Sequence, residues 1–317
     1  MHTKRRRGIN SNQVILQVIA LTGTAWYVLF FYFPYIGLSI AFRDFKLTDN
    51  LFDMRNTTWI GFQFFGEMIR DREMPRVIAN TVIISLMKLA VCLPSAILFA
   101  LLLNEVPKLW YKKLVQTISY FPHFISWIII SLIALYFLSP QFGMINILLT
   151  NLGLISRPLT VLTNSKDFYW LATLLELWKE LGWSSILFIA AVSGIDPTLY
   201  EAAIVDGASR WHKMFYITLP SIMGVVVLVF ILQFSGIFSG GGGTFEQSIF
   251  LGNTLNMDKS MVLGHYTMKT GISLGRFSYA TAVGLVNGIV GLILLGAANS
   301  FCKKFLGRGL YTGGDGQ

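Results

Sequence analysis

Charged residues and cysteines are scarce in this sequence, and each shortage excludes a class of protein. Only 13% of the 317 residues are Asp, Glu, Lys or Arg, whereas 54% are hydrophobic. So few polar side chains cannot cover a water-soluble globule of this size, and the composition therefore predicts a polytopic membrane protein. Two cysteines, Cys92 and Cys302, are too few and too badly placed for a disulfide framework, and we interpret both as inert thiols.

The sequence also lacks the motifs of a catalytic or energy-converting subunit. It has no Gly-x-x-x-x-Gly-Lys-Ser/Thr phosphate loop; the run Gly240 to Gly243 continues into Thr244-Phe245 and is expected to be a flexible loop. The four histidines have no Cys or carboxylate partner at metal-ligand spacing, and no nucleophile elbow is present. We therefore predict no catalytic residue, no metal site and no cofactor bound by this chain.

The apolar residues are concentrated in six segments long enough to cross a bilayer. These segments cover about 14–36, 78–103, 114–138, 168–192, 221–238 and 279–301. The first follows the basic cluster Lys4–Arg7 and is longer than the core of a signal peptide, so it is expected to remain uncleaved. The predicted fold is all-α, a single transmembrane domain over residues 1–317 with six membrane-spanning helices.

The polar segments between the spans indicate how the chain is oriented. The formal charge of +9 lies mainly at the ends of apolar segments, which is typical of charges facing anionic lipid and argues against nucleic acid. With the N-terminus in the cytoplasm, twelve Lys and Arg residues lie in short inside segments and eleven in longer outside loops. The density in short loops favours cytoplasmic N- and C-termini.

The outside loops that this orientation predicts are 43–77, 139–167 and 239–278. In the first, residues 59–68 form an amphipathic stretch that suits the membrane interface. In the second, the apolar patch Met144–Leu149 is too short to span and is expected to be a lid or an interfacial helix.

One cytoplasmic interval, residues 196–220, has the signals of an ordered helix–turn–helix. Asp196 is placed to cap a short helix that begins at Pro197, and Gly207 is placed to end it in a left-handed conformation. Ser209 is placed to cap a second short helix that runs to about Tyr216. Small side chains on the first helix and its turn let another protein approach the backbone closely. Such a surface suits docking of a protein better than chemistry.

This interval resembles the cytoplasmic loop of permease subunits in binding-protein-dependent ABC importers. The family pattern is Glu-Ala-Ala, two residues, Asp-Gly-Ala, five residues, Phe, and a closing Leu-Pro. The matching residues are Glu201, Ala202, Ala203, Asp206, Gly207, Ala208, Phe215 and Leu219-Pro220. Phe215 follows Ala208 after six residues instead of five, and Ile217 is correspondingly one place closer to Phe215 than in the strictest pattern. The resemblance implies that the first six, together with Phe215, belong to the loop that couples the permease to a separate ATPase.

Further stretches along the chain are similar to the carbohydrate branch of that family, in particular to permeases for lipo-oligosaccharides, alginate and similar saccharides. They are Phe33–Gly37 with Ala41-Phe42, Asn80-Thr81, Tyr120–Trp127, Leu177–Trp183 and Ala280–Gly284. The resemblance implies the type I importer permease fold, a location in a bacterial inner membrane and an alternating-access mechanism. It also implies the partners: a second homologous permease, an ATP-binding cassette dimer that holds ATP and Mg, an extracytoplasmic solute-binding protein and an oligosaccharide substrate.

Within the spans, the charged residues of the fourth segment are candidates for the substrate pathway. Glu176, Lys179 and Glu180 would each cost about 2.5–3.5 kcal/mol near mid-bilayer, so they must face protein or water. They are interpreted either as a polar lock between helices or as the wall of a wet sugar pathway. Lys88 in the second span is expected to snorkel or to pair with a carboxylate of the fourth.

Other polar and aromatic residues of the spans have weaker assignments. Trp178 and Trp183 could stack on sugar rings or serve as packing anchors, and Gln233 and Asn287 could form interhelical hydrogen bonds or contact substrate. Gly284 and Gly288, in Gly-x-x-x-Gly spacing, predict close helix packing within the subunit or against a partner.

The sequence can be compared with three functions other than saccharide import. A permease of the same importer class for a non-sugar solute keeps every assignment except the substrate. A self-contained ion-coupled carrier would transport alone and would show inverted repeats with broken helices, which the sequence does not indicate. A membrane enzyme acting on lipid-linked sugar would need paired carboxylates or a metal set in an aqueous loop.

Overall fold

The computed structural model describes residues 11–46, 48–49, 58–238 and 243–310, which form two compact units. One unit contains residues 1–68 and 270–285, and the other contains residues 69–269 and 286–317. The described residues form helices and turns, with one isolated β-bridge between Arg43 and Trp59, so the predicted all-α class is confirmed. The basic cluster Lys4–Arg7 and the expected flexible glycines 240–242 lie outside the described residues.

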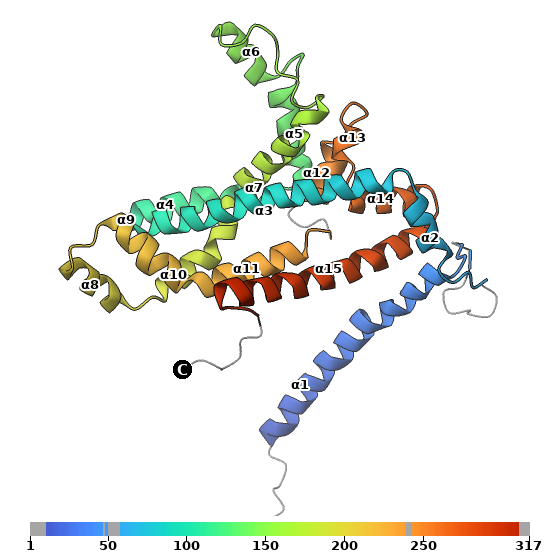
Figure 1. Ribbon diagram of the computed structural model, residues 1–317, viewed down its shortest axis with the longest axis horizontal. Helices are drawn as coiled ribbons and strands as arrows, with labels where there is room; N and C mark the ends of the chain where they lie inside the picture. Colours follow the sequence, from blue (N-terminus) through green and yellow to red (C-terminus); the bar gives the residue numbers. More distant parts are fainter. Residues whose placement is uncertain (1–10, 47, 50–57, 239–242, 311–317) are drawn as a thin grey trace, which may run out of the picture. The chain divides into compact units, whose positions relative to one another are not determined.

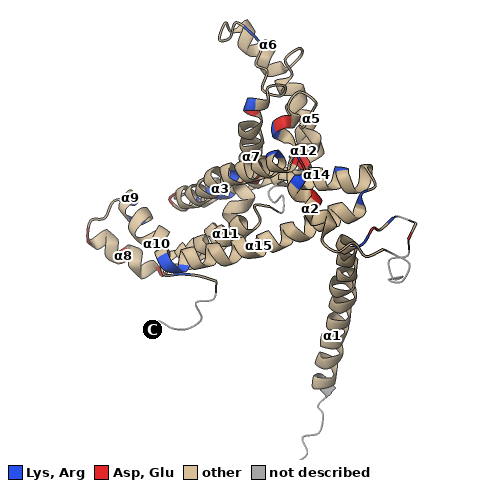
Figure 2. Ribbon diagram, turned by 45° about the vertical axis from the view of Figure 1, so that its right-hand side comes forward, with Lys and Arg blue, Asp and Glu red and all other residues tan. Residues whose placement is uncertain are grey.

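The first unit is dominated by one long apolar helix. Helix α1 (Ser11–Tyr27) continues through a π-helical turn, η1 (Val28–Tyr32), into a 3-10 segment, η2 (Phe33–Phe42). The continuous helix over Gln13–Phe42 is apolar enough to cross a membrane, and its most apolar window is not buried at all by the chain. Figure 2 shows α1 without a charged residue, as a lipid-facing helix requires.

The same unit contains an aromatic cluster beside the end of the first span. The rings of Phe42, Phe62 and Phe65 lie 5.4 Å apart pairwise, and the side chains of Glu67 and Arg276 form an ion pair. Phe65 and Glu67 belong to α2 (Gln63–Arg70), a short helix with an apolar and a polar face inside the stretch predicted to be amphipathic.

The second unit is built on two long helices, α3 (Met74–Asn104) and α7 (Phe168–Ser193), which pack against each other more extensively than any other pair. One core cluster joins Ile84 of α3 to Phe168 and Ala172 of α7. A second cluster joins Ala96 of α3 to Phe188 of α7. Burial of these apolar side chains along the whole helix pair makes it the scaffold for the polar residues considered below.

The predicted continuous third span, 114–138, is not a single straight helix. It consists of α4 (Leu109–Tyr120), a 3-10 turn η3 (Phe121–Phe124) and α5 (Trp127–Leu138), with a bend of 97° between the two arms. Pro122 in the turn has no N–H to continue the helix, and the Ser126 side chain accepts a hydrogen bond from the Ile129 N–H to begin a new one. In Figure 1, α5 turns sharply away from α4.

The remaining helices follow in chain order. They are α6 (Met144–Asn151), η4 (Ser165–Asp167), α8 (Pro197–Val205), α9 (Arg210–Lys213), η5 (Met214–Thr218), α10 (Leu219–Ser221), α11 (Met223–Ser235), α12 (Thr244–Phe250), α13 (Met257–Ser260), α14 (Leu263–Met268), η6 (Lys269–Ser273) and α15 (Phe277–Leu306). In the part of the chain that the structure describes, three single helices are long and apolar enough to span a membrane, and three bent helix pairs bring the number to six if each pair is one span. The predicted fifth segment, 221–238, belongs to one such pair, because α11 follows a 62° bend at Ile222.

The expected loop 239–278 is also more ordered than the sequence indicated. Helix α12 within it contacts α3 and α5. Its Thr244, Gln247 and Ser248 are each 1% exposed. This segment of the loop is therefore part of the interior of its unit.

Candidate functional site

The predicted coupling loop, residues 196–220, has the local structure that its capping residues indicate. The Asp196 carboxylate accepts a hydrogen bond of 2.9 Å from the Thr198 N–H and caps α8, whose first residue is Pro197. That hydrogen bond stabilises the charged carboxylate and lowers the pKa of Asp196 below its usual value. The Ser209 side chain caps α9 by accepting from the His212 N–H at 3.2 Å.

Gly207 ends α8 in a left-handed conformation, with φ of +76°. The Gly207 N–H donates to the Ile204 carbonyl at 3.0 Å, and the Ala208 N–H donates to the Ala203 carbonyl at 2.9 Å. This pair of hydrogen bonds is a Schellman motif, which satisfies carbonyls that a helix end otherwise leaves unpaired. The second helix runs further than the predicted Tyr216, because α9 continues through η5 into α10.

One contact holds the loop on the rest of its unit, and another joins two parts of the loop to each other. Met214 is 2% exposed and packs in the core cluster that contains Ala96 of α3 and Phe188 of α7. The Tyr200 hydroxyl lies 2.9 Å from Thr218 Oγ1 and joins α8 to η5. Met214 therefore connects the loop to the core cluster formed by α3 and α7.

The family-pattern residues divide into an exposed and a supporting set. Ala203 is buried and Ala208 is half-buried beneath the turn. Phe215 is exposed and stacks on Trp211. The other family-pattern residues exposed in the loop are Glu201, Ala202, Asp206, Gly207 and Pro220.

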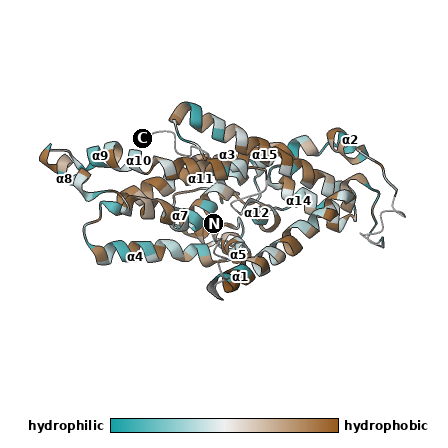
Figure 3. Ribbon diagram, turned by 90° about the horizontal axis from the view of Figure 1, so that it is seen from below, coloured by the Kyte–Doolittle hydropathy of each residue, from teal (hydrophilic) through white to brown (hydrophobic). Residues whose placement is uncertain are grey.

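A hollow of about 540 Å³ lies between the two helices of the loop. Its lining residues are Ala203, Asp206, Gly207, Ala208, Ser209, His212, Tyr216 and Ile217. Figure 3 shows hydrophilic residues on α9 and a predominantly hydrophobic α11, as expected where a chain leaves the bilayer. The loop thus presents an indented surface in which polar and exposed apolar side chains are mixed.

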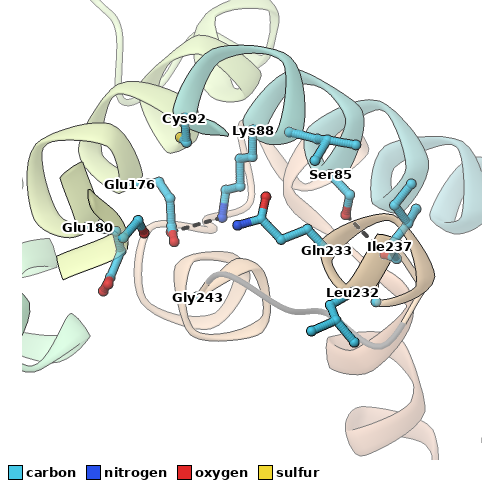
Figure 4. Close-up of a pocket in the computed structure, with 12 residues that line it drawn as sticks. Ser85, Lys88, Cys92, Glu176, Glu180, Leu232, Gln233, Ile237 and Gly243 are labelled. Carbon is cyan, nitrogen blue, oxygen red and sulfur yellow. Dashed lines mark hydrogen bonds and ion pairs between the residues drawn. The ribbon is translucent and has the colours of Figure 1, made fainter. Parts of the chain in front are cut away.

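A second cavity, of about 420 Å³, lies between α3, α7 and α11 (Figure 4). Its lining residues are Ser85, Lys88, Leu89, Cys92, Glu176, Glu180, Ser184, Leu232, Gln233, Gly236, Ile237 and Gly243. We call it the polar cavity. It contains three of the residues that the sequence singled out for a substrate pathway, namely Glu176, Glu180 and Gln233.

Lys88 and Glu176 form a buried ion pair across α3 and α7. Lys88 Nζ lies 3.2 Å from Glu176 Oε2, and the two side chains are 7% and 6% exposed. Lys88 Nζ also donates to Thr244 Oγ1 at 2.9 Å, and Gln247 Nε2 donates to Glu176 Oε2 at 3.4 Å. The prediction that Lys88 pairs with a carboxylate of the fourth span is confirmed.

Glu180 interacts with a second set of side chains, those of Lys179 and His123. Its Oε1 lies 2.9 Å from Lys179 Nζ and its Oε2 lies 2.7 Å from His123 Nδ1. Lys179 Nζ also donates to the His123 carbonyl at 2.5 Å. These contacts join α7 to the turn η3 at which the third span bends. The charges of α7 therefore connect helices and also contribute to a cavity wall.

The other predicted pathway residues lie outside the cavity lining. Trp178 is 47% exposed, and Trp183 stacks on His123 with ring centroids 4.1 Å apart. Asn287, on α15, has a buried side-chain oxygen with no hydrogen-bond partner in the described part of the chain. A Cβ atom added at Gly284 or at Gly288 would have no described atom of its own unit within 4 Å.

Sequence reasoning did not find the contributions of α12 or of His123. Thr244 follows a glycine run that is typical of a loop, and Gln247 is a polar residue in a segment too short to be predicted as a buried helix. The unusual charge density in the fourth span was the signal that partners had to exist elsewhere. Among the described residues, no group of three or more His, Cys, Asp or Glu side chains could hold a metal ion.

Comparison with known proteins gives the same assignment along most of the chain. Residues 92–299 match the family described as "Binding-protein-dependent transport system inner membrane component". Two Bacillus subtilis (strain 168) proteins are similar over nearly their full length. Protein LplB is 35% identical, covering 93% of this chain and 91% of that protein. The polygalacturonan/rhamnogalacturonan transport system permease protein YteP is 37% identical, covering 94% and 91%.

A solved structure has the same fold. It is a crystal structure of a bacterial alginate ABC transporter in complex with alginate pentasaccharide-bound periplasmic protein. One chain of it superposes with a TM-score of 0.84 at 33% identity, covering 94% of this chain and 97% of that one. The chain therefore belongs to the inner membrane component family of binding-protein-dependent transport systems and is the transmembrane translocation subunit of such an importer.

Proposed function

We propose that this chain forms half of the translocation pathway for an oligo- or polysaccharide and is driven by a separate ATPase through residues 196–220. The observation that carries the coupling role is the exposed surface around Glu201 and Gly207, mounted on the ends of α3 and α7 through Met214. The saccharide is supported by the relatives, whose names include polygalacturonan, rhamnogalacturonan and alginate. The polar cavity supplies hydroxyl, amide and carboxylate groups, which are the hydrogen-bonding partners a sugar requires.

The mechanism we propose is alternating access. The ATPase dimer binds ATP and Mg, and this chain holds neither. Closure of that dimer displaces α8 and α9, and the displacement reaches α3 and α7 because Met214 packs between them. The polar cavity would then open alternately to the two sides of the membrane.

The proposed assembly contains partners that complete the pathway. A second homologous permease would provide the other half, and the Gly284–Gly288 side of α15 is available for close packing against it. A solute-binding protein would deliver the saccharide on the outer side. We place both termini of the chain in the cytoplasm of a bacterium, so that residues 196–220 face the ATPase.

The test is ATP hydrolysis by the complete complex in proteoliposomes. Loaded binding protein should stimulate the ATPase. Glu201→Ala or Gly207→Val should reduce that stimulation by about 5–150-fold, the factors to which typical coupling free energies between two sites correspond. Ala190→Gly, in the adjoining α7 but outside the loop, is the control for a nonspecific effect. Full stimulation and full saccharide uptake by both loop variants would contradict the coupling role.

A further inference from the structure

The charges of the polar cavity distinguish between classes of saccharide. Three charged side chains line it, namely Lys88, Glu176 and Glu180. Carboxylates therefore outnumber cations at the wall. Residues 239–242, which the structure does not describe, are serine and glycine and add no charge to this part of the chain.

The one lysine of the wall is already engaged. Lys88 Nζ contacts both Glu176 Oε2 and Thr244 Oγ1, and its side chain is 7% exposed. A substrate carboxylate would have to compete with Glu176 for this ammonium group and would leave the glutamate buried without its partner. Breaking a buried pair in this way is strongly unfavourable.

The second carboxylate is neutralised from behind the wall. Glu180 takes its partners from Lys179 and His123, neither of which lines the cavity. An anionic ligand in the cavity would therefore face carboxylate oxygens at Glu176 and Glu180. In the described lining it would find no cation other than the paired Lys88.

Uncharged polar groups complete the wall. Ser184 and Gln233 line the cavity, and Figure 4 shows the Gln233 amide extending toward Lys88 and Glu176. Hydroxyl groups of a neutral sugar can donate to the carboxylates and exchange hydrogen bonds with the amide. A uronate carboxylate has no proton to donate to these oxygens, so it loses the first of these interactions and gains no unpaired cation in exchange.

We propose that the half-pathway formed by this chain passes uncharged saccharides and excludes uronates. The inference rests on the proposed saccharide transport and specifies its substrate class. It separates this chain from those relatives whose names refer to acidic polysaccharides, although the fold is shared.

The experiment compares two ligands that share a backbone and a length, an oligogalacturonide and its fully methyl-esterified form. Affinity of the cognate binding protein is measured for both, followed by uptake into proteoliposomes that contain the complete complex, at concentrations that saturate the binding protein. The ester is expected to be taken up at least about tenfold faster than the free acid, because the carboxylate of the acid would face acceptor oxygens and no unpaired cation, and an unsatisfied polar group costs binding free energy.

A gain-of-function variant keeps the test independent of folding defects. Gln233→Lys adds a second cation to the cavity, so that cations balance the carboxylates of the wall, and it should raise the ratio of acid to ester uptake at least about tenfold. Gln233→Met removes the amide without adding charge and should leave that ratio as it is in the unmodified chain. Since each ratio is measured within one protein, differences in expression cancel.

Each outcome is decisive. A binding protein that accepts only the free acid, or equal uptake of acid and ester, overturns the inference while saccharide transport stands. Uptake of neither saccharide together with uptake of a non-sugar solute overturns the proposed function itself. An unchanged ratio in Gln233→Lys would show that this wall does not select by charge.

Discussion

At the level of single residues, the buried ion pair of Lys88 and Glu176 stabilises the wall of the polar cavity. Both side chains are buried, so neither charge can be stabilised by water if the other is removed. We predict that Lys88→Met lowers the free energy of unfolding by about 3–5 kcal/mol, the usual loss when one member of a buried pair is deleted. Thermal unfolding in detergent measures it.

The double variant Lys88→Met/Glu176→Leu provides the control for that prediction. It removes both charges and should be more stable than the sum of the two single losses indicates, because no buried charge remains unpaired. Strict additivity of the single variants would mean that the two residues do not interact energetically.

Gly207 is the residue at which backbone conformation limits the coupling loop. Gly207 has φ of +76°. A residue with a Cβ costs about 1–2 kcal/mol in this left-handed conformation, because the Cβ comes too close to the following carbonyl oxygen. Gly207→Ala should therefore disturb the α8 end and weaken ATPase stimulation by loaded binding protein. Gly194→Ala is the matched control, since Gly194 has φ of −89° and its added Cβ would be 3.5 Å from the nearest carbonyl.

The charge state of Asp196 gives the cap of α8 a pH dependence. Its pKa is lower in the folded chain than in the unfolded chain, so its contribution is present above the unfolded pKa. The contribution is lost as the pH falls through the lowered folded value. Coupling measured between pH 6 and pH 8 should therefore be insensitive to this cap, whereas Asp196→Ala should weaken it throughout and Asp196→Asn should preserve it.

At the level of elements, α4 and α7 of the second unit approach each other closely at Gly182. A Cβ at Gly182 of α7 would collide with the backbone carbonyl of Ser119 in α4. Gly182→Ala is predicted to cost about 1–3 kcal/mol by overpacking, measured as a lower thermal unfolding midpoint. Gly224→Ala in α11 is the control, because its added Cβ would lie 3.7 Å from the Arg308 side chain, and an equal loss there would contradict the crossing argument.

The sequence predicted the elements whose signals lie in neighbouring residues, and it missed those that depend on partners distant in the sequence. The caps at Asp196 and Ser209 and the helix end at Gly207 follow from neighbouring residues, and all three were predicted correctly. The break of the third span was missed because apolar residues continue across Pro122, although the proline and Ser126 carried the signal. Helix α12 was missed because its burial depends on partners more than seventy residues away, such as Ala172.

The polar cavity shows the same division between local and distant information. Charge density alone marked Glu176 and Glu180, and the composition of a span indicated that they need partners. Which partner each one has is a matter of tertiary geometry: Glu176 contacts Lys88 across two helices, while Lys179 contacts its sequence neighbour Glu180. Helical spacing could not decide between these pairings.

For the whole molecule, the native cysteines offer a direct test of alternating access. Cys92 lines the polar cavity, whereas Cys302 is fully buried elsewhere in the same unit. In a Cys302→Ala background, a small maleimide should modify Cys92 at rates that differ between the resting complex and the complex trapped with ATP and loaded binding protein. Bound saccharide should slow the reaction in whichever state exposes the cavity.

The same measurement connects the coupling loop to the cavity. If displacement of α8 and α9 reaches α3 through Met214, Gly207→Val should leave the resting labelling rate of Cys92 unchanged and abolish its response to ATP. Ala190→Gly should retain the response. Identical Cys92 labelling rates in every nucleotide and ligand state of the unmodified complex would contradict alternating access at this cavity, and an intact response in Gly207→Val would contradict transmission through the loop.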